Sequence, residues 1–240
     1  MSSLLKELFE RGAHYGYSRR RRHPSVNPYL YGFKNRSAVI DLEKSLVLMA
    51  RAETALKAFG EKKQTVIFVG SKPEARQVVA ATAERLGQPY VASRWIGGTL
   101  TNFPEIKRRL ARLEELKKQL STGGLEMYTK QERGRFQKEL DRLERTFGTI
   151  ADLKSLPAAI VVVDSEVETI AVAEANTLNL PVVSLSGTDC DLRPMTYPVV
   201  GNDASTQTIE WFLSRLALAY EAGLVVAAST AAATTSTPTV

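Results

Sequence analysis

Short apolar runs, each followed by a helical pattern, constrain the fold of this chain most strongly. The runs Thr65–Val69, Ala158–Val163 and Pro181–Leu185 each hold at most one polar residue. Such runs are typical of strands that are buried on both faces of a parallel sheet. Residues 89–92 form a further short strand candidate. Repeated strand–helix–strand units of this length predict an α/β fold, with a parallel sheet covered by helices on both faces.

Helical patterns follow these runs at the expected distances. Pro73 stands where a helix can begin, because the missing N–H of proline is not needed in the first turn. We therefore expect a helix from Pro73 to about Leu86. Other helices are predicted at 42–59, at about 167–178 and at about 205–222, the first of them entered from 38–40.

The pattern changes between residues 103 and 148, where two amphipathic helices are predicted. Thr129 and Glu132 have the spacing of a capping box for the second helix, and Asn102 and Glu105 have it for the first. Residues 121–124 break the pattern between them. Two such helices predict an antiparallel coiled-coil hairpin inserted in the α/β domain. Their apolar positions are Ile106, Leu110, Leu113, Leu116 and Leu120, then Phe136, Leu140, Leu143 and Phe147.

Four parts follow from these patterns. Residues 1–36 are a basic N-terminal segment. Residues 37–102 and 149–222 form the α/β domain. Residues 103–148 are the hairpin insertion. Residues 223–240 carry Ala, Thr and Ser without charge or core periodicity, and are expected to be disordered.

Composition excludes several classes of protein. The single cysteine, Cys190, allows no disulfide within the chain, and His14 and His23 are too few to complete a usual zinc site. We expect no cofactor and no metal, and a reducing compartment such as the cytoplasm. The first ten residues lack the apolar run of a secretion signal, and charges interrupt the apolar window 209–228, so no membrane span is expected.

The charge is unevenly distributed along the chain. Residues 1–36 hold eight basic and two acidic side chains, whereas residues 151–240 hold three basic and ten acidic ones. An acidic partner is expected to face the first part, and the acidic last part to face solvent or basic neighbours.

An arginine run at residues 19–22 is the sharpest local signal for a binding function. Four adjacent guanidinium groups repel one another unless an anion compensates their charge, and each can pair with a phosphate. Tyrosines and Phe33 are interleaved with the basic residues, and glycines and prolines predict an irregular loop that moulds to nucleic acid. We interpret the segment as RNA-binding. The alternative is a solvated basic loop whose aromatic rings pack on the sheet.

Other polar groups have plainer interpretations. Lys72, after Gly70-Ser71, lacks the spacing of a phosphate loop and is interpreted as a surface cation. Trp95 is expected to anchor the base of the hairpin, and the alternative is that it stacks on a partner. His14 and His23 are taken as hydrogen-bonding loop residues. Clustered carboxylates after the strands could hold Mg²⁺ or act as acid and base, but helix capping and solvated loops are favoured for Asp164, Glu166, Glu168, Asp189, Asp191 and Asp203.

Taken together, the motifs resemble the family of the second protein of the bacterial small ribosomal subunit, from Leu4 to about Ala222. Two departures stand out. Tyr17 replaces the second histidine of the family's opening motif, and the loop 187–192 lacks the family's first aspartate and its proline. The matching motifs, in order, are Gly12–Gly16, Asn27–Gly32 with Asn35-Arg36, Ile40–Lys44, Phe68–Lys72, Arg94–Asn102, Leu156-Pro157, and Tyr197-Pro198 with Gly201–Asp203.

This resemblance implies a Rossmann-like α/β domain with a projecting coiled-coil hairpin, and a structural, non-enzymatic role. It implies binding to the small-subunit ribosomal RNA between head and body, support for attachment of the large first protein, and a place near messenger RNA. Competing interpretations are a sugar-phosphate or nucleotide-dependent enzyme and a free scaffolding protein. The residues expected to contact RNA are Tyr17, Arg19, Arg20, Arg21, Arg22, His23, Tyr31, Lys34, Arg36, Arg94, Lys107, Arg108 and Arg109.

Overall fold

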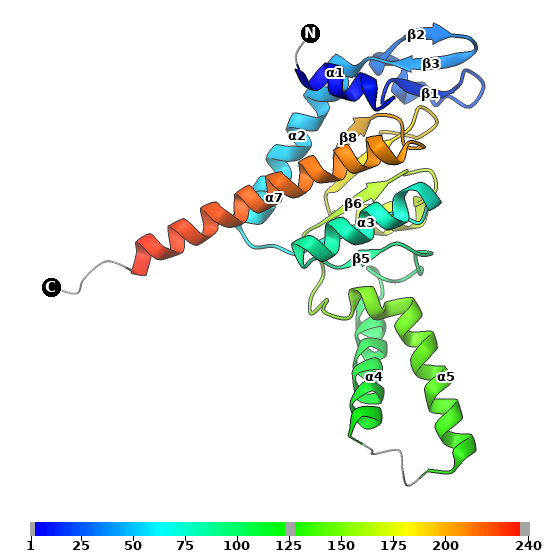
Figure 1. The fold of residues 1–240 in the computed structure, drawn as a ribbon, viewed down its shortest axis with the longest axis vertical. Coiled ribbons are helices and arrows are strands. Elements are labelled where there is room, and N and C mark those ends of the chain that lie inside the picture. Colours follow the sequence, from blue (N-terminus) through cyan, green and yellow to red (C-terminus); the bar gives the residue numbers. More distant parts are fainter. Residues whose placement is uncertain (1–2, 123–127, 236–240) are drawn as a thin grey trace, which may run out of the picture.

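A five-stranded parallel sheet forms the centre of the computed structural model, which describes residues 3–122 and 128–235 (Figure 1). Its strand order is β5-β4-β6-β7-β8, and every neighbouring pair is parallel. The predicted α/β class and parallel sheet are therefore confirmed. The strands are β4 (Val66–Val69), β5 (Tyr90–Val91), β6 (Ala159–Val163), β7 (Val182–Ser186) and β8 (Tyr197–Val200).

Helices cover both faces of this sheet because alternate side chains of each strand point to opposite faces. Val66 and Phe68 of β4 join the core that includes α2 (Leu42–Glu61), α3 (Pro73–Leu86) and α7 (Thr206–Thr235). Ile67 and Val69 face the other way.

That second face packs against α6 (Thr169–Thr177) and against the bases of α4 (Phe103–Ser121) and α5 (Lys130–Phe147). The strands β4 and β6 are buried along their whole length, which explains their uninterrupted apolar sequences.

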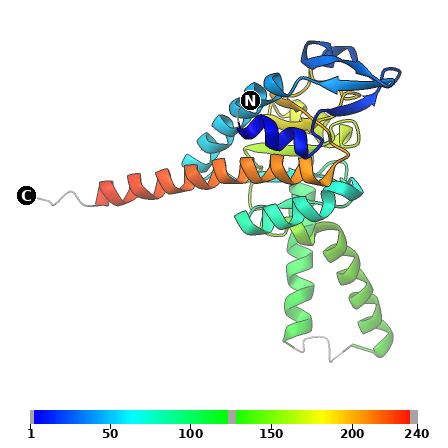
Figure 2. The same ribbon diagram turned by 45° about the horizontal axis from the view of Figure 1, so that its top comes forward.

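The helix α7 is longer than the sequence predicted. It continues to Thr235, so the expectation of a disordered segment from Gly223 is wrong for residues 223–235, and residues 236–240 lie outside the described part. Alanine is the strongest helix former, so a run of alanines without charge extends a helix as readily as it forms a loop. In both views the end of α7 leaves the body of the protein (Figures 1 and 2).

Two glycines allow α7 to cross α2 at close range. A Cβ added to Gly60 would lie 3.1 Å from the Cα of Gly223, and one added to Gly223 would lie 2.8 Å from the amide nitrogen of Glu61. Backbone atoms therefore touch at this crossing. By length and composition, residues 206–229 could span a membrane, but the buried face of α7, with Phe212 and Leu216, belongs to the core of the sheet.

The N-terminal segment forms a second, antiparallel sheet instead of the predicted irregular loop. After α1 (Ser3–Glu10), β1 (Tyr15–Ser18) and β2 (Leu30–Lys34) both pair with β3 (Ser37–Ile40). The short helix η1 (Pro24–Tyr29) connects β1 to β2. Asn35 and Arg36, with φ values of 50° and 67°, make the two-residue turn between β2 and β3. The sheet crosses the domain boundary that was expected after Arg36.

The two predicted amphipathic helices lie between β5 and β6, where α4 and α5 leave the sheet (Figure 1). Leu113 and Leu116 of α4 pack with Leu140 of α5. Thr129 forms the predicted capping box with Glu132. Asn102 makes no side-chain cap, so that part of the prediction is wrong.

Two ion pairs also connect the helices, from Arg112 Nε to Glu139 Oε1 at 3.1 Å and from Lys117 Nζ to Glu144 Oε1 at 2.8 Å. The coiled-coil form of this pairing stays a prediction. Residues 123 and 124 of the expected break lie outside the described part of the chain.

Candidate nucleic-acid interface

The arginine run occupies the turn that follows β1, at the edge of the antiparallel sheet. The amide of Arg21 donates to the carbonyl of Ser18 at 3.0 Å, and the amide of Arg19 donates to the carbonyl of Arg36 at 3.2 Å. Arg19, Arg20 and Arg21 are exposed and Arg22 is partly exposed. These two hydrogen bonds fix the backbone of Arg19–Arg21, and Arg22 follows directly, so the four arginines lie on one short piece of chain.

The aromatic ring of Phe33 contacts two of these arginines. The guanidinium carbons of Arg19 and Arg22 lie 5.3 and 5.5 Å from the ring centre of Phe33 on β2. Cation–π contacts of this kind hold a guanidinium in place while its N–H groups stay free to bind anions. Tyr31 is 83% exposed, so its ring is available for stacking. Lys34 and Arg36 are also exposed, at the β2–β3 turn.

Two of the residues predicted to contact RNA make hydrogen bonds within the protein. The ring of His23 caps η1, with Nδ1 2.8 Å from Ser25 Oγ, which confirms its interpretation as a hydrogen-bonding loop residue. Tyr17 turns its hydroxyl toward Lys72. His14 differs from the prediction, because its ring stacks on Phe9 with centroids 4.3 Å apart, and its Nδ1 is buried without a hydrogen-bond partner among the described residues.

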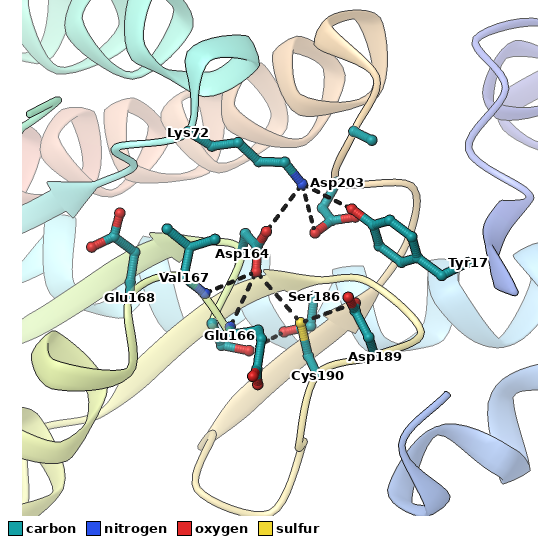
Figure 3. A network of polar contacts seen from close by, with 12 residues as sticks. Tyr17, Lys72, Asp164, Glu166, Val167, Glu168, Ser186, Asp189, Cys190 and Asp203 are labelled. Carbon is teal, nitrogen blue, oxygen red and sulfur yellow. Dashed lines mark hydrogen bonds and ion pairs between the residues drawn. The ribbon is translucent and has the colours of Figure 1, made fainter. Parts of the chain in front are cut away.

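A buried ionic network lies where the antiparallel sheet meets the carboxyl ends of the parallel strands (Figure 3). The Nζ of Lys72 lies 3.0 Å from Asp164 Oδ2, 3.2 Å from Asp203 Oδ2 and 3.0 Å from the hydroxyl of Tyr17. The side chain of Lys72 is 13% exposed and that of Asp203 1%. Both the surface-cation interpretation of Lys72 and the solvated interpretation of Asp164 and Asp203 are therefore wrong.

Burial and charge set the protonation of this network. Burial opposes the charge of Lys72, but the hydrogen bond with Tyr17 and the carboxylates outweigh it and raise the pKa of Lys72. Burial also opposes the charge of Asp164, yet Lys72 holds the pKa of Asp164 below its usual value. Burial and the charge of Asp164 raise the pKa of Asp203 to about 7. These shifts favour a charged Lys72 beside a charged Asp164, whereas burial and Asp164 oppose the charge of Asp203.

A metal ion fits this place poorly. Ligand atoms of Asp164, Cys190 and Asp203 lie within 4.8 Å of one another, but the ammonium of Lys72 already bridges the two carboxylates. Burial raises the pKa of Cys190 to about 12, so this side chain is a neutral thiol, whereas metals bind the thiolate. The residues present favour an internal ion pair.

The loop after β4 offers little to a phosphate group. The amide of Ser71 donates to the buried carboxylate of Glu168 at 2.7 Å, and the ammonium of Lys72 is already paired. A phosphate bound here would have to displace an internal carboxylate. This arrangement gives no support to the nucleotide-dependent alternative.

The remaining predicted contacts lie on a different part of the molecule. Lys107, Arg108 and Arg109 are exposed near the start of α4, and Arg94 is exposed before it. Arg108 and Arg109 line a groove of about 690 Å³ between α4 and α5. The sequence predicted that the lysines and arginines of the hairpin meet phosphates, but it did not single out Arg112, Lys138 and Arg142, which line this groove. The lining residues are Glu105, Arg108, Arg109, Arg112, Lys138, Glu139, Arg142 and Leu143.

A buried carboxylate fixes the base of α4. Trp95 is 4% exposed and packs in the second core with Leu100 and Ile106, which confirms its predicted anchoring role. Its indole Nε1 donates to Glu174 at 3.2 Å, and the amides of Leu100 and Thr101 donate to the same carboxylate at 2.9 and 3.1 Å. Although burial opposes the charge, these hydrogen bonds lower the pKa of Glu174.

Comparison with known proteins matches this arrangement to one family. The family model described as Ribosomal protein S2 covers residues 8–223. The chain belongs to the ribosomal protein S2 family. This confirms the resemblance drawn from the sequence motifs.

Two curated members of the S2 family show how far the similarity extends. Small ribosomal subunit protein uS2 of Nocardia farcinica is 42% identical over 199 residues, which cover 83% of this chain and 70% of that protein. Small ribosomal subunit protein uS2 of Mycobacterium leprae is 39% identical over 224 residues, or 93% of this chain and 81% of that protein. The S2 similarity thus includes both the antiparallel sheet and the helix pair.

Proposed function

We propose that this chain is a structural, non-enzymatic component of the small ribosomal subunit that binds its ribosomal RNA. The arginine turn on the antiparallel sheet carries the proposal, because four arginines follow one another on it, Phe33 contacts Arg19 and Arg22, and Arg19, Arg20 and Arg21 are exposed. The S2 membership and the names of the two relatives support it. Binding neutralises phosphates and releases counterions, without turnover.

A second RNA-contacting surface is proposed on the helix pair. Arg108, Arg112 and Arg142 line its groove with Lys138. The antiparallel sheet and the helix pair lie at opposite ends of the molecule in both views (Figures 1 and 2). Two separated cationic surfaces suit a protein that touches RNA on two sides, in keeping with a place between head and body. A coiled-coil pairing of α4 and α5 would make this end a stiff extension.

The salt dependence of binding tests the arginine turn. Replacing Arg19–Arg22 with alanine should reduce the slope of log affinity against log salt by roughly 3, because each phosphate contact contributes about 0.7–0.9. The variant should also be incorporated less into small subunits. A matched control replaces four exposed basic residues elsewhere, Arg51, Lys57, Lys62 and Lys154, and should leave most of the slope. An unchanged slope in the first variant would remove the arginine turn from the RNA surface.

The family resemblance also suggests where the chain is located and which neighbours it has. We propose a ribosome-bound, cytoplasmic location, support for the attachment of the large first protein of the small subunit, and proximity to messenger RNA. Subunits assembled without this chain should then retain less of the first protein than complete subunits, as measured by mass spectrometry of gradient fractions. Equal amounts in both preparations would contradict that part of the proposal.

A further inference from the structure

The carboxyl edge of the parallel sheet is occupied by the protein's own N-terminal segment. In open α/β sheets this edge is the usual place for a ligand. Here Lys72 follows β4, Asp164 follows β6 and Asp203 follows β8, and Tyr17 of β1 reaches into the same network (Figure 3).

We propose that Lys72 is a positioning residue for RNA binding, because its ammonium joins the buried carboxylates of the sheet to β1 and so orients the arginine turn. The proposal rests on the proposed function, in which that turn contacts RNA. Lys72 does not touch the RNA itself. Its side chain is 13% exposed, and its ammonium lies within 3.2 Å of polar oxygens of Tyr17, Asp164 and Asp203.

Tyr17 transmits the position of Lys72 to the arginine turn. The hydroxyl of Tyr17 lies 3.0 Å from Lys72 Nζ, and the guanidinium of Arg21 lies over the other part of the same side chain, 4.6 Å from the ring centre. One aromatic ring therefore connects the buried cation with an arginine at the surface. A shift of the Tyr17 ring would therefore also shift or break its contact with the guanidinium of Arg21.

A second set of contacts, with the loop after β7, fixes the position of β1 and of the arginine turn along that loop. The amide of Tyr17 donates to Thr188 Oγ1 at 2.8 Å, and the amide of His23 donates to the carbonyl of Thr188 at 2.9 Å. Arg21 Nη2 lies 3.2 Å from Asp189 Oδ2. A Cβ on Gly16 would lie 2.5 Å from Thr188 Cγ2, so the strand lies directly against this loop.

The positive charge of Lys72 is what stabilises the two buried carboxyl groups beside β1. Asp164 and Asp203 are buried together, and the ammonium of Lys72 is the only Lys or Arg group that pairs with either of them among the described residues. Without Lys72 the buried charge of Asp164 would face a second carboxyl group with no cation between them, which is strongly unfavourable. The acidic edge would also repel phosphate. Lys72 thus holds β1 and neutralises the surface beneath the arginine turn.

Hydrogen exchange and RNA binding, measured on the same variants, test this inference. Lys72→Met keeps an unbranched side chain and removes the charge. Because a variant of a buried ion pair can unfold, Tyr17→Phe is the second variant, and it removes only the hydroxyl that faces Lys72. The control is Lys62→Met, the same change at an exposed lysine at the end of α2.

Lys72→Met should raise the exchange rate of the amides of residues 15–23 at least tenfold, while β6 and β7 change less. Tyr17→Phe should raise it about three- to tenfold, the equivalent of one hydrogen bond. Both variants should bind a ribosomal RNA fragment at least threefold more weakly than the Lys62→Met control.

Three other results would each overturn a different part of the proposal. Unchanged exchange in Tyr17→Phe and in folded Lys72→Met would overturn the anchoring. Faster exchange with undiminished RNA affinity would overturn the positioning role. If the unmodified chain does not bind ribosomal RNA at low salt, the proposed function is wrong, whatever the exchange data show.

Discussion

The crossing of α2 and α7 offers a sharp test of the packing. Gly223→Ala would place a methyl group against the carbonyl oxygen of Lys57 and 2.8 Å from the amide nitrogen of Glu61. Both are backbone atoms of α2, so no side-chain rotation can relieve the contact and the helices must separate. Overpacking of a core typically destabilises by about 1–3 kcal/mol, and a backbone clash places this variant near 3 kcal/mol. For a domain of this size that lowers Tm by about 6–12 °C.

The control for this variant is a second helical glycine on α5. Gly134 has nothing within 4 Å of a built Cβ, so Gly134→Ala should stabilise the protein by up to about 1 kcal/mol through helix propensity alone. Both variants are measured by urea unfolding and by thermal melting. A Gly223→Ala variant as stable as the unmodified protein would refute the close crossing of α2 and α7.

Three further predictions concern ionisable and capping groups. The raised pKa of Asp203, about 7, means that its protonated form stabilises the fold. The stability advantage of the unmodified protein over Asp203→Asn should therefore be largest at low pH and decline as the pH rises through about 7, with Lys72 and Asp164 as the charges that face it. A pH-independent difference in urea unfolding would contradict this. The lowered pKa of Glu174 has the opposite sign. Glu174→Gln should be clearly less stable than the unmodified protein at neutral pH, and the gap should close as the pH falls below the usual carboxyl range; a constant gap would count against the charged acceptor. Thr129→Ala removes the capping box of α5 and should weaken that helix end by about 1 kcal/mol, seen as faster amide exchange in its first turn and not in α3.

The parallel sheet could be predicted because its strands are apolar on both faces. β4 and β6 bury every residue, so their sequences are continuous apolar runs that need no knowledge of the neighbours. The edge strand β8 was missed, since Tyr197 and Pro198 are only partly buried and interrupt the pattern.

The antiparallel sheet could not be predicted from local patterns. β1 contains Gly16, and the burial of β2 does not alternate cleanly, so neither strand shows the period of two that marks a half-buried strand. Pairing with β3 and contact with Thr188 hold them in place. The basic and aromatic residues suggested a binding surface, which stays a prediction, but the sequence did not show that Tyr17 and His23 make contacts within the protein.

The ionic network depends on distances along the chain that no local motif encodes. Lys72 lies 92 residues before Asp164 and 131 before Asp203. Because Lys72 and Asp164 each follow a predicted parallel strand, both were expected at the same edge of the sheet, whereas Asp203 follows β8, which was not predicted. The sequence did not show the path of β1, which brings Tyr17 to that edge and helps to bury Lys72.

A structural component of the small ribosomal subunit must sediment with that subunit. The most direct measurement is a sucrose-gradient profile of a cell extract, at moderate and at high salt, with the chain detected in each fraction. We expect the chain to sediment with small subunits at moderate salt and to be partly released at high salt. A chain that stays at the top of the gradient under both conditions would contradict it.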